Sequence, residues 1–448
     1  MGATAALTGF LDGCRRVVGD GAVLVDHDLT ASYVTDWTRR FTGSTSEVAA
    51  IVALARRYGV ALVPQGGNTG LVGGGVPRAG EVVLSLARLT GLGPVDRLAG
   101  QVTSGAGVTL AALAAHAAGD GLAFGVDLGS RDSATIGGMV ATNAGGLHVV
   151  RHGAMRAQVV GVEAVLGTGQ VVSRLGGLVK DNTGYDLAQL LCGSEGTLGV
   201  VTAARLRLVA PPAQVVTALV GVGTVDEVVA MAGEARRALP DVVALELMTG
   251  PSLRLVGDYL GAAPPVAPDA GAYLLVEVAS AVDPVPALAA AIEAHAGVQG
   301  TAVATEPGDR ARLWRWREAH SEAGAAQGVV HKLDVTLPAG EMARFCADVV
   351  DRVEAARPGA VTLLFGHVGD GNVHVNVVGP PVDDEGVDDV VLGLVVERGG
   401  SISAEHGIGT VKKRWLERDR SAAEVAAMRA IKSALDPDGI LNPGVLLP

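Results

Sequence analysis

Three separated glycine-rich loops interrupt the first 200 residues, and they constrain the fold more than any other feature of this chain. The first follows a short apolar run at 60–63, the second spans 127–146, and the third spans 180–199. Glycine supplies 63 of the 448 residues, roughly twice its usual share, without a collagen-like period. Such loops present bare backbone amides, which suit a phosphate or pyrophosphate. Three of them in one region predict a single large ligand held by several loops.

An alternative interpretation is that these loops are only long turns. The first loop, Pro64–Gly75, contains no GxGxxG, and the chain contains no GxxxxGK[ST], so neither of the common nucleotide-binding patterns is present. Glycine-rich loops are frequent and weakly specific when they stand alone. From the loops by themselves, both interpretations stay open.

The regions around these loops show recognisable helix and strand signals. Ser44 and Glu47 form a capping box, apolar residues follow at helical spacing, and Gly59 predicts the end of that helix. Short strands are expected at 60–63, 81–86 and 101–104, and Pro211-Pro212 is a plausible linker. From 213 onward a strand at 272–278 and a helix at 285–296 indicate an α+β or α/β domain. No motif in 213–310 indicates chemistry.

A second concentration of polar residues lies in the hairpin 365–376 and in the segment 404–407. Alternation over 373–378 is typical of a half-buried strand, which places His374 and Asn376 on one face. A glycine-rich turn at 369–371 would bring His367 back beside His374. With Glu405 these imidazoles predict a divalent metal site that keeps an open position, as in catalytic zinc centres. The alternative is a polar loop whose histidines are satisfied within the protein.

Two further cationic residues precede this hairpin. The segment 313–322 predicts a helix in which Arg317 and Ser321, four residues apart, share a face. Lys332 begins a predicted strand at 331–338. Taken alone, such residues are more often solvated surface charges than ligand contacts. An amphipathic helix is expected at 421–435, before the turn-rich stretch 436–444.

Composition excludes some classes of function. A net charge of −12 argues against nucleic acid as the main partner, although a small anion needs only a local basic pocket. The three cysteines are widely spaced without a CxxC, so a reducing cytoplasm is the expected compartment. The N-terminus lacks the charged and apolar regions of a signal peptide, and no apolar run reaches the length of a membrane span.

Several long motifs together resemble one family. The run 64–76, Asp127–Gly129, the segments 136–138 and 141–146, 180–187 and 193–199 resemble the FAD-binding half of vanillyl-alcohol-oxidase-type flavoproteins (the p-cresol-methylhydroxylase type). Residues 369–374, 403–407 and 435–443 resemble the FAD-linked oxidase C-terminal domain of the FAD-dependent D-2-hydroxyacid dehydrogenases. The branch acting on D-2-hydroxyglutarate looks closest, and D-lactate dehydrogenases and the glycolate oxidase D subunit are near relatives.

The resemblance implies an α+β fold in three parts. Residues 1–212 would form an FAD-binding domain of two α+β subdomains, and 213–395 a substrate-binding domain with an antiparallel sheet and helices. Residues 396–448 would form a C-terminal segment that returns to the flavin and completes the active site.

The resemblance also assigns roles to individual positions. His406 corresponds to the catalytic base, and His367, His374 and Glu405 to the ligands of Zn²⁺ or Mn²⁺. Arg317, Ser321, Lys332 and Asn376 correspond to positions that hold the substrate carboxylates. Trp314 and Trp316 are expected near that clamp, where they would narrow the substrate range. The implied FAD-binding residues are Pro64, Gln65, Gly66, Gly67, Asn68, Thr69, Gly70, Leu71, Leu128, Gly129, Ser130, Thr135, Ile136, Gly137, Gly138, Asn143, Gly145, Gly146, Glu195, Gly196, Val200 and Asn442.

The implied reaction is oxidation of a D-2-hydroxy acid to the 2-oxo acid by hydride transfer to non-covalent FAD. Arg317 together with Lys332 favours a dicarboxylate such as D-2-hydroxyglutarate or D-malate over D-lactate, because a second cationic pair suits a second carboxylate. The alternatives are a D-lactate or other monocarboxylate dehydrogenase, a metal-dependent hydrolase without flavin, and a non-catalytic flavin-binding protein. A quinone, an electron-transfer flavoprotein or a dye would accept the electrons, and the resemblance is compatible with a homodimer.

Overall fold

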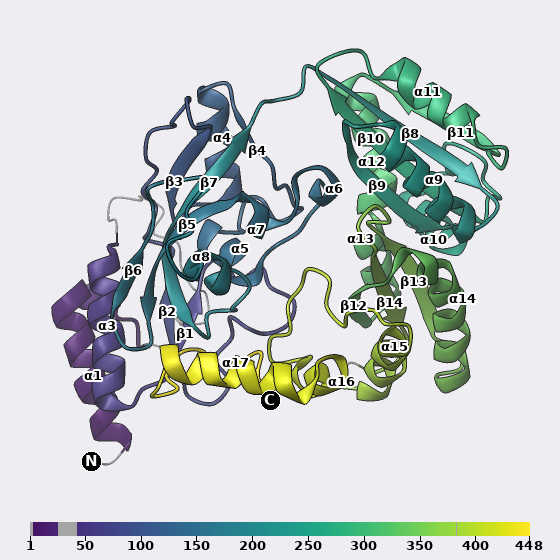
Figure 1. The fold of residues 1–448 in the computed structure, drawn as a ribbon. Coiled ribbons are helices and arrows are strands. Elements are labelled where there is room, and N and C mark those ends of the chain that lie inside the picture. The colour runs from purple at the N-terminus through teal and green to yellow at the C-terminus, as the bar shows by residue number, and fades with distance from the viewer. Residues whose placement is uncertain (1–2, 26–42, 382) are drawn as a thin grey trace. The chain divides into compact units, whose positions relative to one another are not determined.

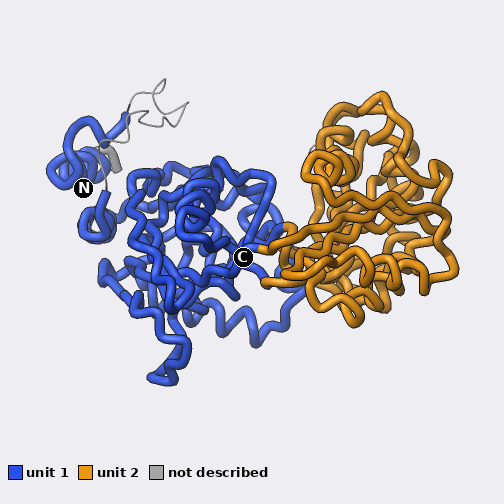
Figure 2. Tube along the Cα trace, turned by 90° about the horizontal axis from the view of Figure 1, so that it is seen from above, with its two compact units in different colours: residues 1–146, 153–211, 406–448 blue, residues 147–152, 212–405 orange. Residues whose placement is uncertain are grey.

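The computed structural model describes residues 3–25, 43–381 and 383–448 and divides them into two compact units (Figures 1 and 2). Unit 1 contains residues up to 146, 153–211 and 406–448, and unit 2 contains 147–152 and 212–405. The chain therefore leaves unit 1 between Pro211 and Pro212 and returns to it after Glu405. The predicted domain limits at 212/213 and 395/396 stay predictions.

Unit 1 is built on two sheets. Strands β1 and β2 pair in parallel, and β3, β7, β5 and β6 form an antiparallel sheet in that order, with β4 paired to β7. The strands are β1 (Leu62–Gln65), β2 (Val82–Ser85), β3 (Gln101–Gly105), β4 (Ala123–Phe124), β5 (Val159–Leu166), β6 (Val171–Ser173) and β7 (Gly199–Val209). The expected strands at 81–86 and 101–104 are thus confirmed, and the one expected at 60–63 begins two residues later.

Two helices of unit 1, α3 and α17, begin where the sequence signals place them. Ser44 and Glu47 form the predicted capping box, and Gly59 ends that helix in the left-handed conformation. Ser421 and Glu424 form a second capping box at the start of the predicted tail helix. The helices are α1 (Ala3–Val18), η1 (Asp20–Ala22), α3 (Thr45–Tyr58), α4 (Leu110–Gly119), α5 (Ile136–Thr142), α7 (Met155–Gln158), α8 (Leu187–Leu191), η2 (Lys413–Trp415), α16 (Leu416–Asp419) and α17 (Ala422–Leu435).

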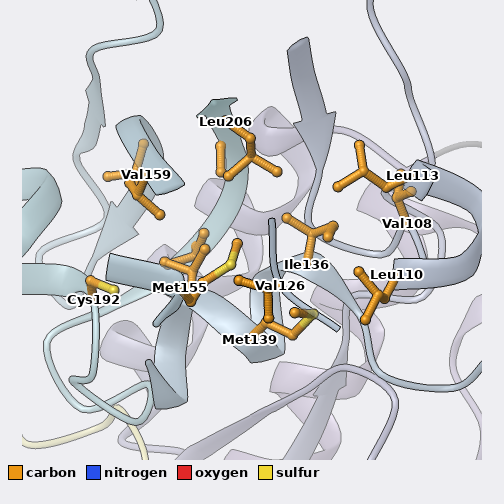
Figure 3. Close-up of a cluster of buried hydrophobic side chains, with 14 of the residues drawn as sticks. Val108, Leu110, Leu113, Val126, Ile136, Met139, Met155, Val159, Cys192 and Leu206 are labelled. Atoms are coloured by element: carbon orange, nitrogen blue, oxygen red, sulfur yellow. The ribbon is translucent and has the colours of Figure 1, made fainter. Parts of the chain in front are cut away.

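Two apolar clusters hold unit 1 together. One packs α4, α5 and α7 against the antiparallel sheet through side chains such as Leu113, Ile136 and Met155, as Figure 3 shows. The other joins α1 and α3 to β1 and β2, and it includes Leu441 from the C-terminal segment. Leu441 forms a β-bridge with Leu62, so the end of the chain returns to the strand that precedes the first glycine loop.

Unit 2 is a seven-stranded antiparallel sheet in the order β11-β8-β10-β9-β13-β14-β12. Its strands are β8 (Gln214–Val222), β9 (Val242–Thr249), β10 (Ala272–Ser280), β11 (Gly300–Ala304), β12 (Val330–Thr336), β13 (Val361–Gly366) and β14 (Asn372–Val378). Its helices are α6 (Val149–His152), α9 (Val225–Ala238), α10 (Gly250–Leu260), α11 (Val285–Glu293), α12 (Pro307–Glu318), α13 (His320–Gln327), α14 (Ala339–Ala356) and α15 (Glu385–Glu397). The expected antiparallel sheet with helices, and with it the α+β fold, is confirmed.

Helices cover both faces of this sheet. Helices α9, α14 and α15 pack on one face, and α10, α12 and α13 pack on the other. The second face carries an apolar cluster that includes Tyr273, Leu275 and Phe365 from the strands and Trp314 and Trp316 from α12. These two rings are therefore part of this core cluster, and the expectation that they lie near the substrate clamp stays a prediction. The indole Nε1 of Trp314 donates a 2.8 Å hydrogen bond to Glu277 inside this layer.

The single helix expected over 313–322 is wrong, because α12 ends at Glu318 and α13 begins at His320. Ala319 between them has ψ −11°, well away from the helical value near −42°. The carbonyl of Arg317 pairs with the His320 ring at 3.0 Å. Arg317 is buried on α12 and Ser321 is exposed on α13, so the two residues do not share one face of a single helix as predicted. No helix among the described residues is long and apolar enough to cross a membrane.

Candidate active site

The predicted cofactor loops come together within unit 1. Glycine is required at Gly67, because a Cβ there would overlap the carbonyl oxygen of Ser133 in the second loop. Asn442 of the C-terminal segment ties two further loops together, since its Nδ2 donates to the carbonyls of Gly74 at 2.9 Å and Glu195 at 2.7 Å. The backbone N–H of Asn442 donates a 2.8 Å hydrogen bond to the carbonyl oxygen of Leu62. The first and second loops are thus packed on each other, and the C-terminal segment holds the first and third.

The predicted FAD-binding residues occupy distinct positions around these loops. Pro64 and Gln65 end β1, residues 66–71 and 128–130 lie in loops, and Thr135 precedes α5, which contains Ile136, Gly137 and Gly138. Asn143 ends α5 with φ 53°, before Gly145 and Gly146. Glu195 and Gly196 precede β7. Val200 lies on β7 and packs its side chain in the core.

These loops fit a polar cofactor. Two buried hydroxyl oxygens, Oγ1 of Thr135 and Oγ of Ser194, have no hydrogen-bond partner among the described residues. Buried hydroxyls are normally paired, so each calls for a partner that the described residues do not provide. Thr135 caps α5 without a side-chain cap bond, and its hydroxyl faces the first glycine loop at Gly66. Polar groups of a bound dinucleotide would satisfy these oxygens.

Glu195 has a structural task beside its predicted cofactor contact. Its carboxylate accepts the backbone N–H groups of Ile408 at 2.8 Å and Gly409 at 2.7 Å, just after His406. Burial raises the pKa of Glu195, and these two hydrogen bonds oppose that rise. Glu195 therefore fixes the backbone that follows the predicted catalytic histidine.

In unit 2 the predicted ligands gather at the β13–β14–β12 end of the sheet. His374 on β14 lies opposite Asp334 on β12, and the His374 Nδ1 is 3.4 Å from an Asp334 carboxylate oxygen. The predicted hairpin geometry is confirmed, because the turn residue Gly371 has φ 88° and the rings of His367 and His374 lie 5.3 Å apart, edge to face. His367 immediately follows β13, and its Nε2 is 3.9 Å from the Glu405 carboxylate.

A compact group of ligand atoms results. Asp334, His374 and Glu405, together with His406, the next residue along the chain, each offer one atom, and all four atoms lie within 4.8 Å of one another. His367 is not in this group, although it is near two of its members. Two imidazoles and two carboxylates are suitable ligands for Zn²⁺ or a similar divalent cation. The assignment of His367, His374 and Glu405 as ligands and of His406 as base stays a prediction.

Two buried carboxylates that sequence analysis missed organise this group. Asp334 is fully buried. One of its carboxylate oxygens accepts a 2.6 Å hydrogen bond from Nδ2 of Asn372, and the other accepts a 2.8 Å hydrogen bond from the backbone N–H of Glu405. Glu246 on β9 binds the His367 ring and the Arg317 guanidinium. Only the position of Asp334, two residues after Lys332 and therefore on the same strand face, signalled a role. Nothing in the sequence around Glu246 did so.

The charge state of the His367 ring is determined mainly by its neighbour Glu246. Burial alone would lower the pKa of His367, but the Glu246 charge and hydrogen bond outweigh burial and raise it to about 9. Burial would raise the pKa of Glu246, but His367 and Arg317 lower it. Both groups therefore favour their ionised forms when no metal is bound.

The predicted substrate residues are only partly assembled. Lys332 and Asn376 are direct cross-strand partners on β12 and β14, so they project from the same face as Asp334 and His374. Asn376 is buried and Lys332 is exposed. Arg317 is buried over the Phe365 ring, 4.8 Å from its centroid, and Phe365 in turn contacts His374. Ser321 is exposed on α13.

Comparison with known proteins identifies the family. The model of the FAD binding domain matches residues 40–174, and that of the FAD linked oxidases, C-terminal domain, matches 211–446. A D-2-hydroxyglutarate dehydrogenase of Xanthomonas citri pv. viticola is 40% identical over 92% of both chains. The mitochondrial D-2-hydroxyglutarate dehydrogenase of Danio rerio is 34% identical over 97% of this chain and 84% of its own length.

Solved structures support the fold. p-Cresol methylhydroxylase with substrate bound has a TM-score of 0.75 at 14% identity and covers 98% of this chain, with 96% of its own chain matched. The 4-ethylphenol oxidase of Gulosibacter chungangensis has a TM-score of 0.74 at 18% identity, with 99% of this chain and 97% of its own chain matched. The chain therefore belongs to the FAD-linked oxidases, among the FAD-dependent D-2-hydroxyacid dehydrogenases, and is an FAD-dependent oxidoreductase.

Proposed function

We propose that this protein oxidises a D-2-hydroxy acid, with D-2-hydroxyglutarate and D-malate as preferred substrates, to the 2-oxo acid. The observation that carries the proposal is that the proposed ligands His374 and Glu405, the proposed base His406 and the buried Asp334 each place one atom within 4.8 Å of the others. The chain that carries this group belongs to the FAD-linked oxidases. The relatives named above are D-2-hydroxyglutarate dehydrogenases. Anaerobic mixing with D-2-hydroxyglutarate should bleach the visible absorbance of the flavin, whereas no bleaching by any D-2-hydroxy acid would contradict the proposal.

FAD supplies the hydride acceptor in this reaction, and we propose that it is bound without a covalent link. The loops 64–75 and 128–146 contain no cysteine, histidine or tyrosine that could tether a flavin. Acid precipitation of the protein should therefore release the flavin into the supernatant. Flavin that stays in the pellet would contradict non-covalent binding.

For the metal, we propose Zn²⁺ or Mn²⁺ held by His367, His374 and Glu405, with Lewis acidity toward the substrate 2-hydroxyl as its contribution. Asp334 is 3.4 Å from His374 Nδ1 and would orient that ring rather than bind the metal directly. Chelation should abolish turnover while the flavin spectrum persists, and added zinc or manganese should restore activity. Full activity of a metal-free His374→Ala protein would exclude this role.

For the proton, we propose His406 as the general base that takes it from the 2-hydroxyl. An imidazole is well matched to this task near neutral pH, and Glu195 fixes the backbone two and three residues later. His406→Ala should keep flavin and metal yet lose roughly 10²–10⁴-fold in kcat, the usual contribution of general base catalysis. Loss of the metal itself would make His406 a ligand instead.

We propose that Arg317 and Lys332 bind the second carboxylate of the substrate, the one distant from C2. Asn376 would bind the carboxylate at C1. Arg317 uses only its Nε toward Glu246, and its two terminal amino groups make no hydrogen bond among the described residues. Lys332→Met should reduce kcat/KM for D-2-hydroxyglutarate and D-malate far more than for D-lactate. Arg344→Met, which removes an exposed cation of α14, is the control. An equal loss for all three acids, or a wild-type preference for D-lactate, would show a monocarboxylate enzyme.

We further propose a quinone or an electron-transfer flavoprotein as the electron acceptor, replaceable by a dye, and the cytoplasm as the compartment. All three cysteines are buried and none forms a disulfide, which suits a reducing environment. Steady-state assays with each acceptor class, and fractionation of cells that produce the protein, test these two points.

A further inference from the structure

We propose that Glu246 is a positioning residue that couples the metal ligand His367 to the substrate clamp Arg317; this inference rests on the proposed function. The Glu246 side chain is 1% exposed and lies on β9, in the middle of the sheet. One carboxylate oxygen is 2.7 Å from His367 Nδ1, and the other is 2.7 Å from Arg317 Nε. One carboxylate thus joins two residues that the proposed function assigns to different ligands.

The bond to His367 determines which ring nitrogen can bind a metal. An ionised carboxylate only accepts hydrogen bonds, so His367 must carry its proton on Nδ1. The neutral ring then presents its lone pair at Nε2, the atom that lies 3.9 Å from Glu405. A buried carboxylate behind a metal-binding histidine is a recurrent arrangement, and it fixes both ring orientation and tautomer.

The hydrogen bond between Glu246 and Arg317 leaves the two terminal amino groups of the guanidinium able to bind another anion. Glu246 takes only the Nε–H, and the Phe365 ring lies beneath the guanidinium at 4.8 Å. The two terminal amino groups are left to form a bidentate contact with a substrate carboxylate. Without Glu246 the charge of Arg317 would be buried without a partner, which is strongly unfavourable. Loss of this single carboxylate should therefore weaken metal binding and anion binding together.

Glu246→Gln tests the coupling directly. The single amide oxygen of glutamine can accept from only one of the two donors, and its NH₂ group would face the other. With purified flavin-loaded protein, competition between the apo-site and a chromophoric chelator should show Zn²⁺ affinity reduced roughly 10–100-fold. In the metal-free protein, the dissociation constant for 2-oxoglutarate, followed by the flavin spectrum, should rise roughly five-fold or more.

Glu277→Gln is the matched control. Glu277 is also buried on the same face, on the adjacent strand β10, and it accepts a hydrogen bond from Trp314 of α12, the helix that carries Arg317. This variant should change neither constant. Equal losses in both variants would mean a general packing effect and would overturn the proposal. Weakened zinc binding with unchanged 2-oxoglutarate binding in Glu246→Gln would overturn the coupling.

A second pair of variants covers the case in which Glu246→Gln does not fold. Arg317→Met removes the cation that competes with His367 for the Glu246 charge, so Zn²⁺ affinity should increase roughly five-fold or more. Arg310→Met removes a cation from the same helix, 3.6 Å from Glu277, and should leave zinc affinity unchanged. Unchanged zinc affinity in Arg317→Met would also overturn the proposal. Zinc titration requires no turnover, so failure of every D-2-hydroxy acid as substrate would refute the proposed function without deciding this test.

Discussion

The cofactor loops of unit 1 and the predicted metal and substrate residues of unit 2 are held in place by different kinds of interaction. In unit 1 the predicted contacts are mainly glycines and uncharged residues, and the loops fit because backbone approaches backbone, as at Gly67 and Ser133. In unit 2 most of the predicted contacts are charged or titratable, and buried carboxylates hold Arg317, His367 and the backbone of Glu405. Steric fit therefore positions the first set, whereas charge balance positions the second. Glu195 is the exception in unit 1, because its buried carboxylate organises a backbone turn.

Gly67→Ala should have the largest effect, because it breaks the steric arrangement of unit 1. A methyl group at this position overlaps a backbone oxygen of Ser133, and the backbone can relieve this only by moving. We expect a loss of about 3 kcal/mol or more in the free energy of unfolding, with reduced flavin content. Gly70→Ala, where a Cβ meets nothing within 4 Å, should leave the stability unchanged. Similar melting temperatures for both variants would contradict the steric argument.

Asp334→Asn should have the next largest effect, because it breaks the charge balance of unit 2 without changing shape. The amide would turn an NH₂ group toward Asn372 Nδ2 or toward the N–H of Glu405, leaving one buried donor unpaired. We expect a loss of about 2 kcal/mol by urea unfolding, the usual cost of a buried unsatisfied group. Asp241→Asn, at a half-exposed carboxylate paired with Arg151, should cost less than about 1 kcal/mol. Equal costs would show that burial is not decisive.

The same contrast explains what the sequence could predict. The capping box of Ser44 and Glu47 and the strand containing His374 depend on neighbours in the chain, and both were predicted. The expectation that this strand is half-buried was wrong, because helices cover both faces of the sheet and β14 is buried along its whole length. Glu246 has its partners 71 and 121 residues away, in a region without motifs, so only the folded sheet reveals it. The division of 313–322 at Ala319 could not be predicted, because no glycine or proline marks it in the sequence.

The neutral, buried His320 ring predicts that the stability of the protein depends on pH. It is fully buried beside Arg317 and Phe365, and burial together with the Arg317 charge lowers its pKa to about 3. The unfolded chain binds a proton near pH 6.5 and the folded chain does not, so stability falls as pH decreases from 6.5 toward 3. Between pH 6.5 and 5 the wild type should lose about 2 kcal/mol more than His320→Gln in urea unfolding. Parallel pH profiles for the two proteins would contradict this.

Thr135→Val should have the smallest effect on stability, and it distinguishes the two regions most directly. In unit 2 the buried carboxylates Glu246 and Asp334 are paired within the protein, so their removal costs stability. The Thr135 hydroxyl is buried without a partner among the described residues, so valine, which has nearly the same shape, removes an unsatisfied group. The flavin-free protein should therefore be unchanged or more stable by about 1 kcal/mol, while FAD affinity decreases. Thr142→Val on the same helix, whose hydroxyl already bonds Gly138 at 3.0 Å, should leave FAD affinity unchanged. A Thr135→Val protein that is less stable without flavin, yet binds FAD as the wild type does, would show that this hydroxyl serves the fold rather than the cofactor.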